Sequence, residues 1–171
     1  ADLNELSRYG GMLQSCMRAE EAIGLATQYF SRLLPETGGT LYRVRASQDY
    51  AEEVAHWGEH AINGPALFPL PDCWALRRGQ PHVHRAHHEL LPCNHVSTPS
   101  LGATPSYACV PLIAQGSQLG LLYLSSHDDA FLARLDLVKT AAEQLSMALS
   151  SLDLQARLRV QSIREPLTGL F

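Results

Sequence analysis

The sequence has no excess of positive charge and no long apolar run. Its 13 Lys and Arg residues are outnumbered by 17 Asp and Glu residues, giving a formal net charge of −4. Nucleic-acid-binding proteins usually carry a clustered basic face, so this balance argues against a nucleic-acid partner. A membrane-spanning helix needs about 20 mostly apolar residues, and no such run occurs. Because the first residues are polar and form no secretory signal, we expect a cytoplasmic protein without membrane contact.

Cysteines and catalytic motifs are also scarce. Four cysteines in 171 residues are too few and too scattered for a disulfide framework, so free thiols or metal ligands are expected instead. The sequence contains no Gly-rich phosphate loop, nucleophile elbow or paired-carboxylate motif. We therefore expect no catalysis by this stretch of chain. Its length and composition fit one globular domain with a connecting element.

The spacing of apolar residues predicts two helices followed by two strands. A repeat of three to four residues indicates a first helix over residues 3–16 and a second from about residue 18 to Pro35. The Gly38–Gly39 pair reinforces the end of the second helix. The pattern then changes over residues 40–45 and 53–58, which predicts two strands of a hairpin or meander.

The region between Asn63 and Pro105 is rich in proline. Seven prolines exclude a long helix or a central strand from most of it, so we expect a long structured excursion. Within it, residues 72–79 are predicted to form a short helix with Asp72 as the N-cap and Gly79 as the C′ residue.

Two apolar strands and a long helix complete the pattern. The strands are expected over residues 107–114 and 119–125, joined by a four-residue hairpin loop that contains Gly116. The helix spans roughly residues 130–164, about 50 Å at 1.5 Å per residue, which is more than a small domain covers.

This helix carries a heptad seam. Apolar or small residues recur in alternating steps of three and four at Leu135, Val138, Ala142, Leu145, Leu149, Leu152 and Ala156. The seam then moves to Val160 and Ile163, a stutter that locally unwinds a left-handed supercoil. We predict a homodimer formed through the N- and C-terminal helices. The alternative is a single long helix packed on its own sheet.

Cysteines and histidines are concentrated in the excursion. Five of the eight histidines and two of the four cysteines lie in this region: Cys73, His82, His84, His87, His88, Cys93 and His95. Thiolate and imidazole are preferred zinc ligands, and Cys73, His82, Cys93 and His95 can supply a Cys₂His₂ site, with Cys109 as a substitute ligand. Their spacing matches no established zinc module. The alternatives are a thiol–disulfide switch and ordinary buried cysteines with solvated histidines. No haem-binding motif in the sequence supports haem ligation by Cys93 or His95.

Four residues are candidates for binding a small molecule, namely Trp74, Arg77, Arg78 and Tyr107. A guanidinium beside a pocket can clamp a phosphate or carboxylate. The alternative for the two arginines is a solvated last helical turn, where cations suit the helix dipole. Trp74 can stack on a ligand, although an aromatic residue in a domain of this size is more often part of the core.

One hairpin points to a known family. The run Cys109-Val110-Pro111-Leu112-Ile113, then Gly116, then Leu119-Gly120-Leu121-Leu122-Tyr123-Leu124 resembles the hairpin typical of GAF domains. The resemblance implies a PAS-related α+β fold with an antiparallel sheet of five to six strands. It places the N- and C-terminal helices on one face and a pocket roofed by loops and short helices on the other. Some GAF domains attach a bilin through a cysteine beside a histidine, but here Asn94 separates Cys93 from His95.

The last seven residues carry a second resemblance. Glu165-Pro166-Leu167-Thr168-Gly169-Leu170-Phe171 is similar to the opening of GGDEF domains, the catalytic domains of diguanylate cyclases. Residues 73–79 and 93–95 also look like a GAF subgroup often found upstream of GGDEF domains. The resemblance implies a GAF sensor over residues 1–155, a signalling helix over 156–164 and a truncated GGDEF domain from 165.

Together the two resemblances imply a bacterial small-molecule sensor that controls cyclic di-GMP synthesis. The parent protein is then an enzyme that condenses two GTP molecules across a dimer of its catalytic domains, although this fragment is not itself an enzyme. The alternative from another class is a zinc-stabilised or thiol-redox dimerisation module with no exchangeable ligand.

Overall fold

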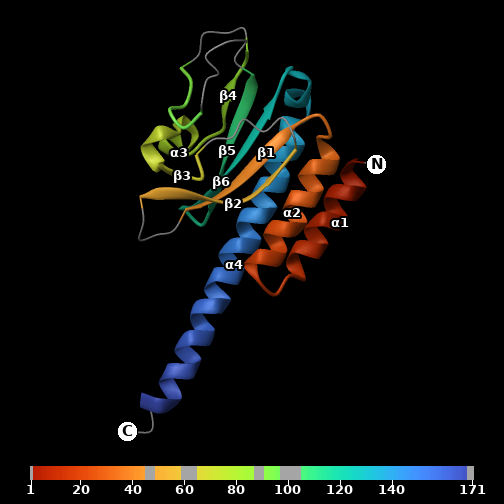
Figure 1. The fold of residues 1–171 in the computed structure, drawn as a ribbon. Helices are drawn as coiled ribbons and strands as arrows, with labels where there is room; N and C mark the ends of the chain where they lie inside the picture. Colours follow the sequence, from red (N-terminus) through yellow and green to blue (C-terminus); the bar gives the residue numbers. More distant parts are fainter. Residues whose placement is uncertain (1, 45–48, 59–64, 87–90, 97–104, 169–171) are drawn as a thin grey trace.

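A six-stranded antiparallel sheet forms the centre of the fold (Figure 1). The computed structural model describes residues 2–44, 49–58, 65–86, 91–96 and 105–168. In spatial order the strands are β3 (Leu67–Pro69), β2 (Tyr50–Trp57), β1 (Gly38–Val44), β6 (Ser117–Ser126), β5 (Ser106–Ala114) and β4 (His82–His84). Each strand runs antiparallel to its neighbours. The predicted α+β class and strand number are confirmed.

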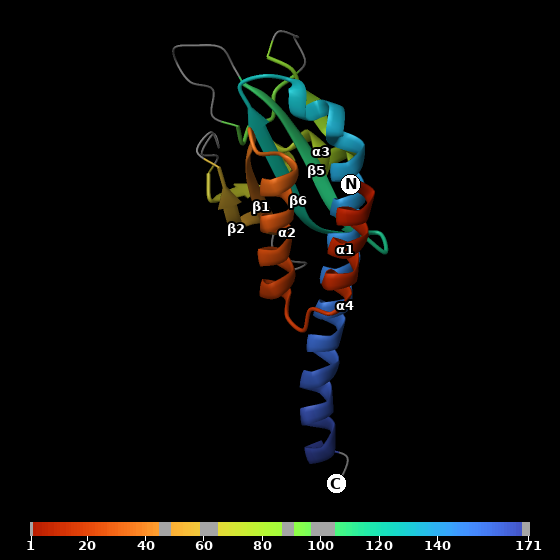
Figure 2. The ribbon, with the colours of Figure 1, turned by 90° about the vertical axis from the view of Figure 1, so that its right-hand side faces the viewer.

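Three helices cover one face of this sheet (Figures 1 and 2). They are α1 (Asp2–Gln14), α2 (Ala19–Leu33) and α4 (Leu135–Thr168). The core between these helices and the sheet includes Phe30, Leu122, Leu145 and Leu149, all fully buried. The apolar residues of the helices, spaced three or four apart, therefore face every second residue of the strands, as the sequence pattern predicts.

The hairpin between β5 and β6 is tighter than predicted. Its loop contains two residues, Gln115 and Gly116, instead of four. Both have positive φ, 53° and 76°, which a type I′ turn requires and which matches the right-handed twist of the strands. Glycine adopts this conformation without steric cost, so Gly116 favours the two-residue turn that pairs Ala114 with Ser117.

The Gly38–Gly39 pair belongs to β1 and does not stop α2, which ends at Leu33. A Cβ atom on Gly39 would lie 2.1 Å from the ring of Trp57, so only glycine lets this indole lie across the strand. The Trp57 ring in turn stacks on Phe30 with centroids 6.1 Å apart. The glycine is therefore required by packing between the sheet and α2.

Short elements cover the opposite face of the sheet. They include a 3₁₀ turn, η1 (Leu70–Asp72), and the helix α3 (Trp74–Arg78). Gly79 ends α3 in the left-handed conformation, as predicted. The predicted N-cap is wrong: Cys73 occupies that position, because Asp72 is held in η1. The backbone N–H of Cys73 donates to Leu70, which closes the 3₁₀ turn one residue before α3 begins.

The long helix α4 packs on its own domain over much of the predicted heptad seam. Val138, Ala142, Leu145, Leu149 and Leu152 are buried in the core shared with α1, α2 and the sheet. The side chains of residues 154–161 are exposed, and this part of α4 extends away from the sheet (Figure 1). The buried seam therefore cannot also be the contact surface for a second helix.

The ends of α4 also differ from the prediction. Residues 130–134 form a separate 3₁₀ turn, η2 (Ala130–Arg134), and α4 continues to Thr168, beyond the expected end at residue 164. Residues 169–171 lie outside the described part of the chain.

Candidate functional site

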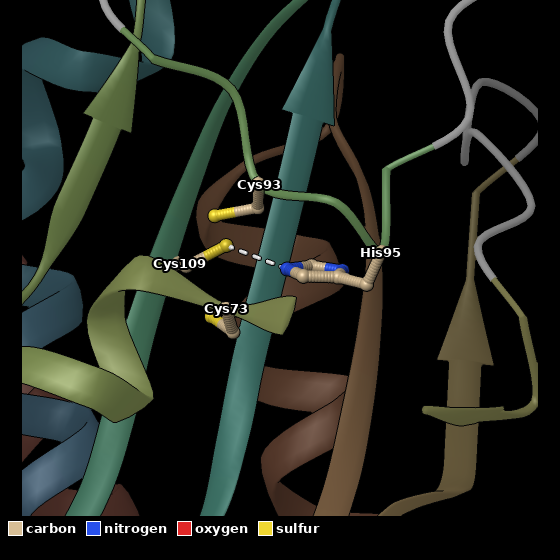
Figure 3. Close-up of side chains that lie close together, drawn as sticks. All are labelled: Cys73, Cys93, His95 and Cys109. Atoms are coloured by element: carbon tan, nitrogen blue, oxygen red, sulfur yellow. Dashed lines mark hydrogen bonds between the residues drawn. The ribbon is translucent and has the colours of Figure 1, made fainter. Parts of the chain in front are cut away.

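Three cysteines and one histidine come together on the sheet face opposite the long helices (Figure 3). Cys109 lies in β5, where Tyr107 and Cys109 point to this face and Ala108 and Val110 point to the helices. Cys73 stands at the junction of η1 and α3. Cys93 and His95 lie in a turn whose Val96 N–H donates to the Cys93 carbonyl at 3.2 Å. The cluster therefore joins one strand to two covering segments.

The four side chains meet closely. Their potential ligand atoms all lie within 4.8 Å of one another. Cys109 Sγ lies 3.6 Å from His95 Nε2, the contact marked in Figure 3. All four residues are buried, with exposed fractions of 0% for Cys73, 2% for Cys93, 3% for His95 and 0% for Cys109. We refer to these four residues as the Cys₃His cluster.

Neighbouring groups hold the Cys₃His cluster in place. The Trp74 backbone N–H donates to Cys93 Sγ at 3.3 Å, and the Cys93 N–H donates to the Tyr107 hydroxyl at 2.8 Å. Phe68 stacks on the His95 ring with centroids 4.4 Å apart, and Tyr123 meets the same ring edge-on at 5.8 Å. These contacts fix both the sulfur of Cys93 and the plane of the imidazole.

The three thiols have different tendencies to ionise. Burial raises the pKa of Cys109 well above its usual value, and its contacts with Cys73 and Cys93 raise it further. The hydrogen bond with Cys109 lowers the pKa of Cys73, but the contact with Cys93 and burial outweigh it and raise that pKa to about 12. Hydrogen bonds from Cys109, Cys73, His95 and Trp74 lower the pKa of Cys93 despite burial. Of the three thiols, Cys93 therefore gives up its proton most readily.

One candidate metal ligand lies outside the cluster. His82 is directly opposite Cys109 in the register of β4 and β5, but its Nε2 lies 3.1 Å from the Leu91 carbonyl oxygen. Cys109, the predicted substitute, lies beside Cys73, Cys93 and His95 instead. His84 stacks on Tyr107 with centroids 4.9 Å apart. His87 and His88 lie outside the described residues.

The candidate ligand-binding residues do not share one site. The Arg77 guanidinium lies 4.3 Å from the centroid of the half-buried Trp74 ring, a cation–π contact near the surface. Arg78 is exposed, and its Nη2 donates to Gln80 Oε1 at 3.4 Å. Tyr107 is fully buried and contacts the cluster. Sequence reasoning omitted Phe68 and Tyr123. Tyr123 lies opposite Cys109 in the register of β5 and β6, which the predicted four-residue loop would have shifted by one residue.

The Tyr107 hydroxyl provides a test of this arrangement. Tyr107→Phe removes the acceptor of the buried Cys93 N–H, so we expect a loss of about 1–3 kcal/mol in the free energy of unfolding, measured by urea denaturation. The control is Tyr50→Phe, since Tyr50 is 46% exposed and should change little. Equal stability of the two variants would show that the Cys93 turn is not held by this bond.

Comparison with known proteins identifies the family. The family model for the GAF domain matches residues 18–149. The chain belongs to the GAF family. GAF domains are in general small-molecule-sensing signalling modules, and the fold described above is a GAF fold. A search of curated proteins found no significant match.

Solved structures with the same fold have diverse functions. The chain is similar to free methionine-R-sulfoxide reductase from Neisseria meningitidis (TM-score 0.71, 17% identity, covering 88% of this chain and 89% of that one). It is equally similar to the GAF domain of a phosphoenolpyruvate-protein phosphotransferase from Coxiella burnetii (TM-score 0.71, 18% identity, covering 91% and 96%). The chain is also similar to a segment of a methyl-accepting chemotaxis protein, residues 122 to 287 (TM-score 0.66, 15% identity, covering 86% and 98%). At these identities the likeness establishes the fold alone.

Among the described residues, no helix combines the length and apolar character needed to cross a membrane.

Proposed function

We propose that this GAF domain is a cytoplasmic regulatory input module that senses a small molecule and controls a diguanylate cyclase domain following it in the chain. The observation that carries the proposal is the course of α4, which is anchored by buried residues up to Leu152 and exposed over residues 154–161. A helix that is rigidly seated at one end and free at the other suits the transmission of a change in orientation. The likeness of residues 165–171 to a GGDEF opening supports the choice of output.

A continuous set of contacts leads from the Cys₃His cluster, on one face of the sheet, to α4 on the other face. The His95 ring stacks on Phe68 at 4.4 Å, and Phe68 meets Tyr42 edge-on at 4.9 Å. Tyr42 lies in β1 beside Arg43, whose side chain reaches the other face and donates to Asp153 of α4 at 2.7 Å. Coupling needs an element with two arrangements that both sites bias, and we propose α4 for that role.

The output further requires a dimer, and we propose that α1 and α4 form it. Met147, Leu154 and Leu158 recur on one stripe of α4 and are 68%, 49% and 53% exposed. Leu3 of α1 is also exposed, at 73%. A second copy of the chain can cover these side chains, and the two α4 helices would then bring two catalytic domains together.

The test is a helix-phase experiment in a fusion of this chain to the remainder of a GGDEF domain. Two residues inserted between Leu158 and Arg159 rotate the following helix by about 200°, whereas seven residues restore its phase to within about 20°. We expect the two-residue insertion to change cyclic di-GMP production by about 5–150-fold, the usual range of allosteric coupling. The seven-residue insertion is the matched control and should retain the parental rate. Equal rates in all three proteins would contradict control through α4.

A further inference from the structure

The Cys₃His cluster has the donor set of a metal site. Cysteine thiolate and histidine imidazole are the ligands of structural zinc, and Cys₃His is one of its common combinations. Each of the four residues contributes one donor atom, and they converge from three separate segments of the chain. Within the described residues, these four are the one group of cysteine, histidine and acidic side chains close enough to hold an ion.

The distances fit a single ion. Zinc lies about 2.3 Å from sulfur and 2.0–2.1 Å from nitrogen in a tetrahedral site, so a sulfur and a nitrogen on the same ion are about 3.6 Å apart. Cys109 Sγ and His95 Nε2 are 3.6 Å apart. Two sulfurs on one tetrahedral zinc are about 3.8 Å apart, and all donor atoms here lie within 4.8 Å. Small side-chain movements therefore bring the full set onto one ion.

The surroundings are also those of a bound ion. The Trp74 N–H at 3.3 Å from Cys93 Sγ provides the outer hydrogen bond that metal-bound thiolates commonly accept. Phe68 and Tyr123 exclude water from the imidazole and fix its plane. Burying an imidazole and ionised thiolates in this apolar space is costly unless they are paired, and a divalent cation pairs all of them at once.

We propose that Cys73, Cys93, His95 and Cys109 bind one Zn²⁺ ion in a closed tetrahedral site. Four protein donors leave no coordination position open, so the ion is structural and not catalytic. It fastens the η1–α3 junction and the Cys93–Val96 turn to β5, and so holds the covering segments on the sheet. This inference stands independently of the output domain proposed above.

The first experiment measures metal in the intact chain, purified under reducing conditions without a metal-affinity step. We expect about one zinc per chain by elemental analysis. Replacement by Co²⁺ should give the visible bands of four-coordinate cobalt and a sulfur-to-cobalt charge-transfer band. Protein that contains no zinc, binds none on reconstitution and gives no such spectrum with Co²⁺ overturns the proposal. So does an iron chromophore in the freshly purified protein.

Substitutions then assign the ligands. Cys109→Ser and His95→Ala should each weaken zinc binding by more than the roughly 100-fold that loss of an outer contact costs. The matched controls are Cys16→Ser, which packs on the helical face of the sheet, and His82→Ala, which lies opposite Cys109 in β4 but bonds to Leu91. Both controls should keep one zinc per chain. If His82→Ala loses zinc and His95→Ala retains it, the proposed ligand set is wrong. The cobalt spectrum of the unaltered chain decides the case if a ligand variant does not fold.

Discussion

Removing zinc is expected to lower the thermal unfolding midpoint of the protein by about 8–16 °C. A ligand that binds only the folded state at a free concentration 1,000 times its Kd stabilises that state by about 4 kcal/mol. For a chain of this length each kcal/mol shifts the midpoint by about 2–4 °C. Calorimetry before and after chelation measures the effect, and zinc, but not magnesium, should restore the original midpoint.

The size of this shift follows from what the cluster joins. Cys73 and Cys93 hold segments whose remaining attachment to the sheet consists of short elements such as β3 and β4, each three residues long. These segments bury little apolar surface compared with the helical face, so the ion supplies a large share of their stability. The Cys109→Ser variant is the control, because chelation should not shift its midpoint. An unaltered chain that melts at the same temperature with and without chelator would refute a structural ion.

The cluster shows how far composition alone can define a site. The density of cysteine and histidine in the excursion drew attention to Cys73, Cys93 and His95, which the structure places together. It placed His82 in the ligand set and Cys109 as a substitute, whereas the structure places Cys109 in the cluster. The two residues stand directly opposite each other in β4 and β5, so they lie on the same face of the sheet. What separates them is local contact: His82 Nε2 bonds to the Leu91 carbonyl, whereas Cys109 Sγ lies beside His95.

The proline-rich region shows a different limit. Among the residues of this region that the structure describes there is no long element, as the seven prolines predict, yet β3 and β4 exist as three-residue strands. Pro69 ends β3 at the edge of the sheet, where a missing N–H costs no ladder bond. Such strands are too short to show alternation, and they form because β2 and β5 present free edges. Their presence is thus a consequence of tertiary structure.

The heptad seam of α4 shows why periodicity cannot identify the surface against which a helix packs. A repeat of three and four residues indicates that one stripe of a helix is buried. The sequence pattern is the same whether that stripe packs on the domain's own sheet or on a second helix. Leu145 and Leu149 are fully buried within the chain. The stripe left for a second copy lies elsewhere on the helix, at Met147, Leu154 and Leu158. Dimerisation remains a prediction, but it now rests on these residues.

A pair of leucine substitutions in α4 separates the two roles of this helix. Leu149 is fully buried in the core, so Leu149→Ala leaves a cavity and should lower the free energy of unfolding by about 2–5 kcal/mol, a large part of the 5–15 kcal/mol of an ordinary domain. Leu154 is 49% exposed in the single chain. Leu154→Ala should therefore leave the stability of the monomer nearly unchanged. Urea denaturation at low protein concentration measures both values.

The same pair should respond oppositely when association is measured. In a dimer formed through the exposed stripe of α4, Leu154 becomes a buried contact, so Leu154→Ala should shift sedimentation toward monomer at concentrations where the unaltered chain is dimeric. Leu149→Ala removes no side chain from that stripe, and while it stays folded it should dimerise normally. If the unaltered chain sediments only as a monomer at high concentration, the exposed stripe has no second copy to cover it. If Leu149→Ala abolishes association while Leu154→Ala does not, the dimer forms through a different surface.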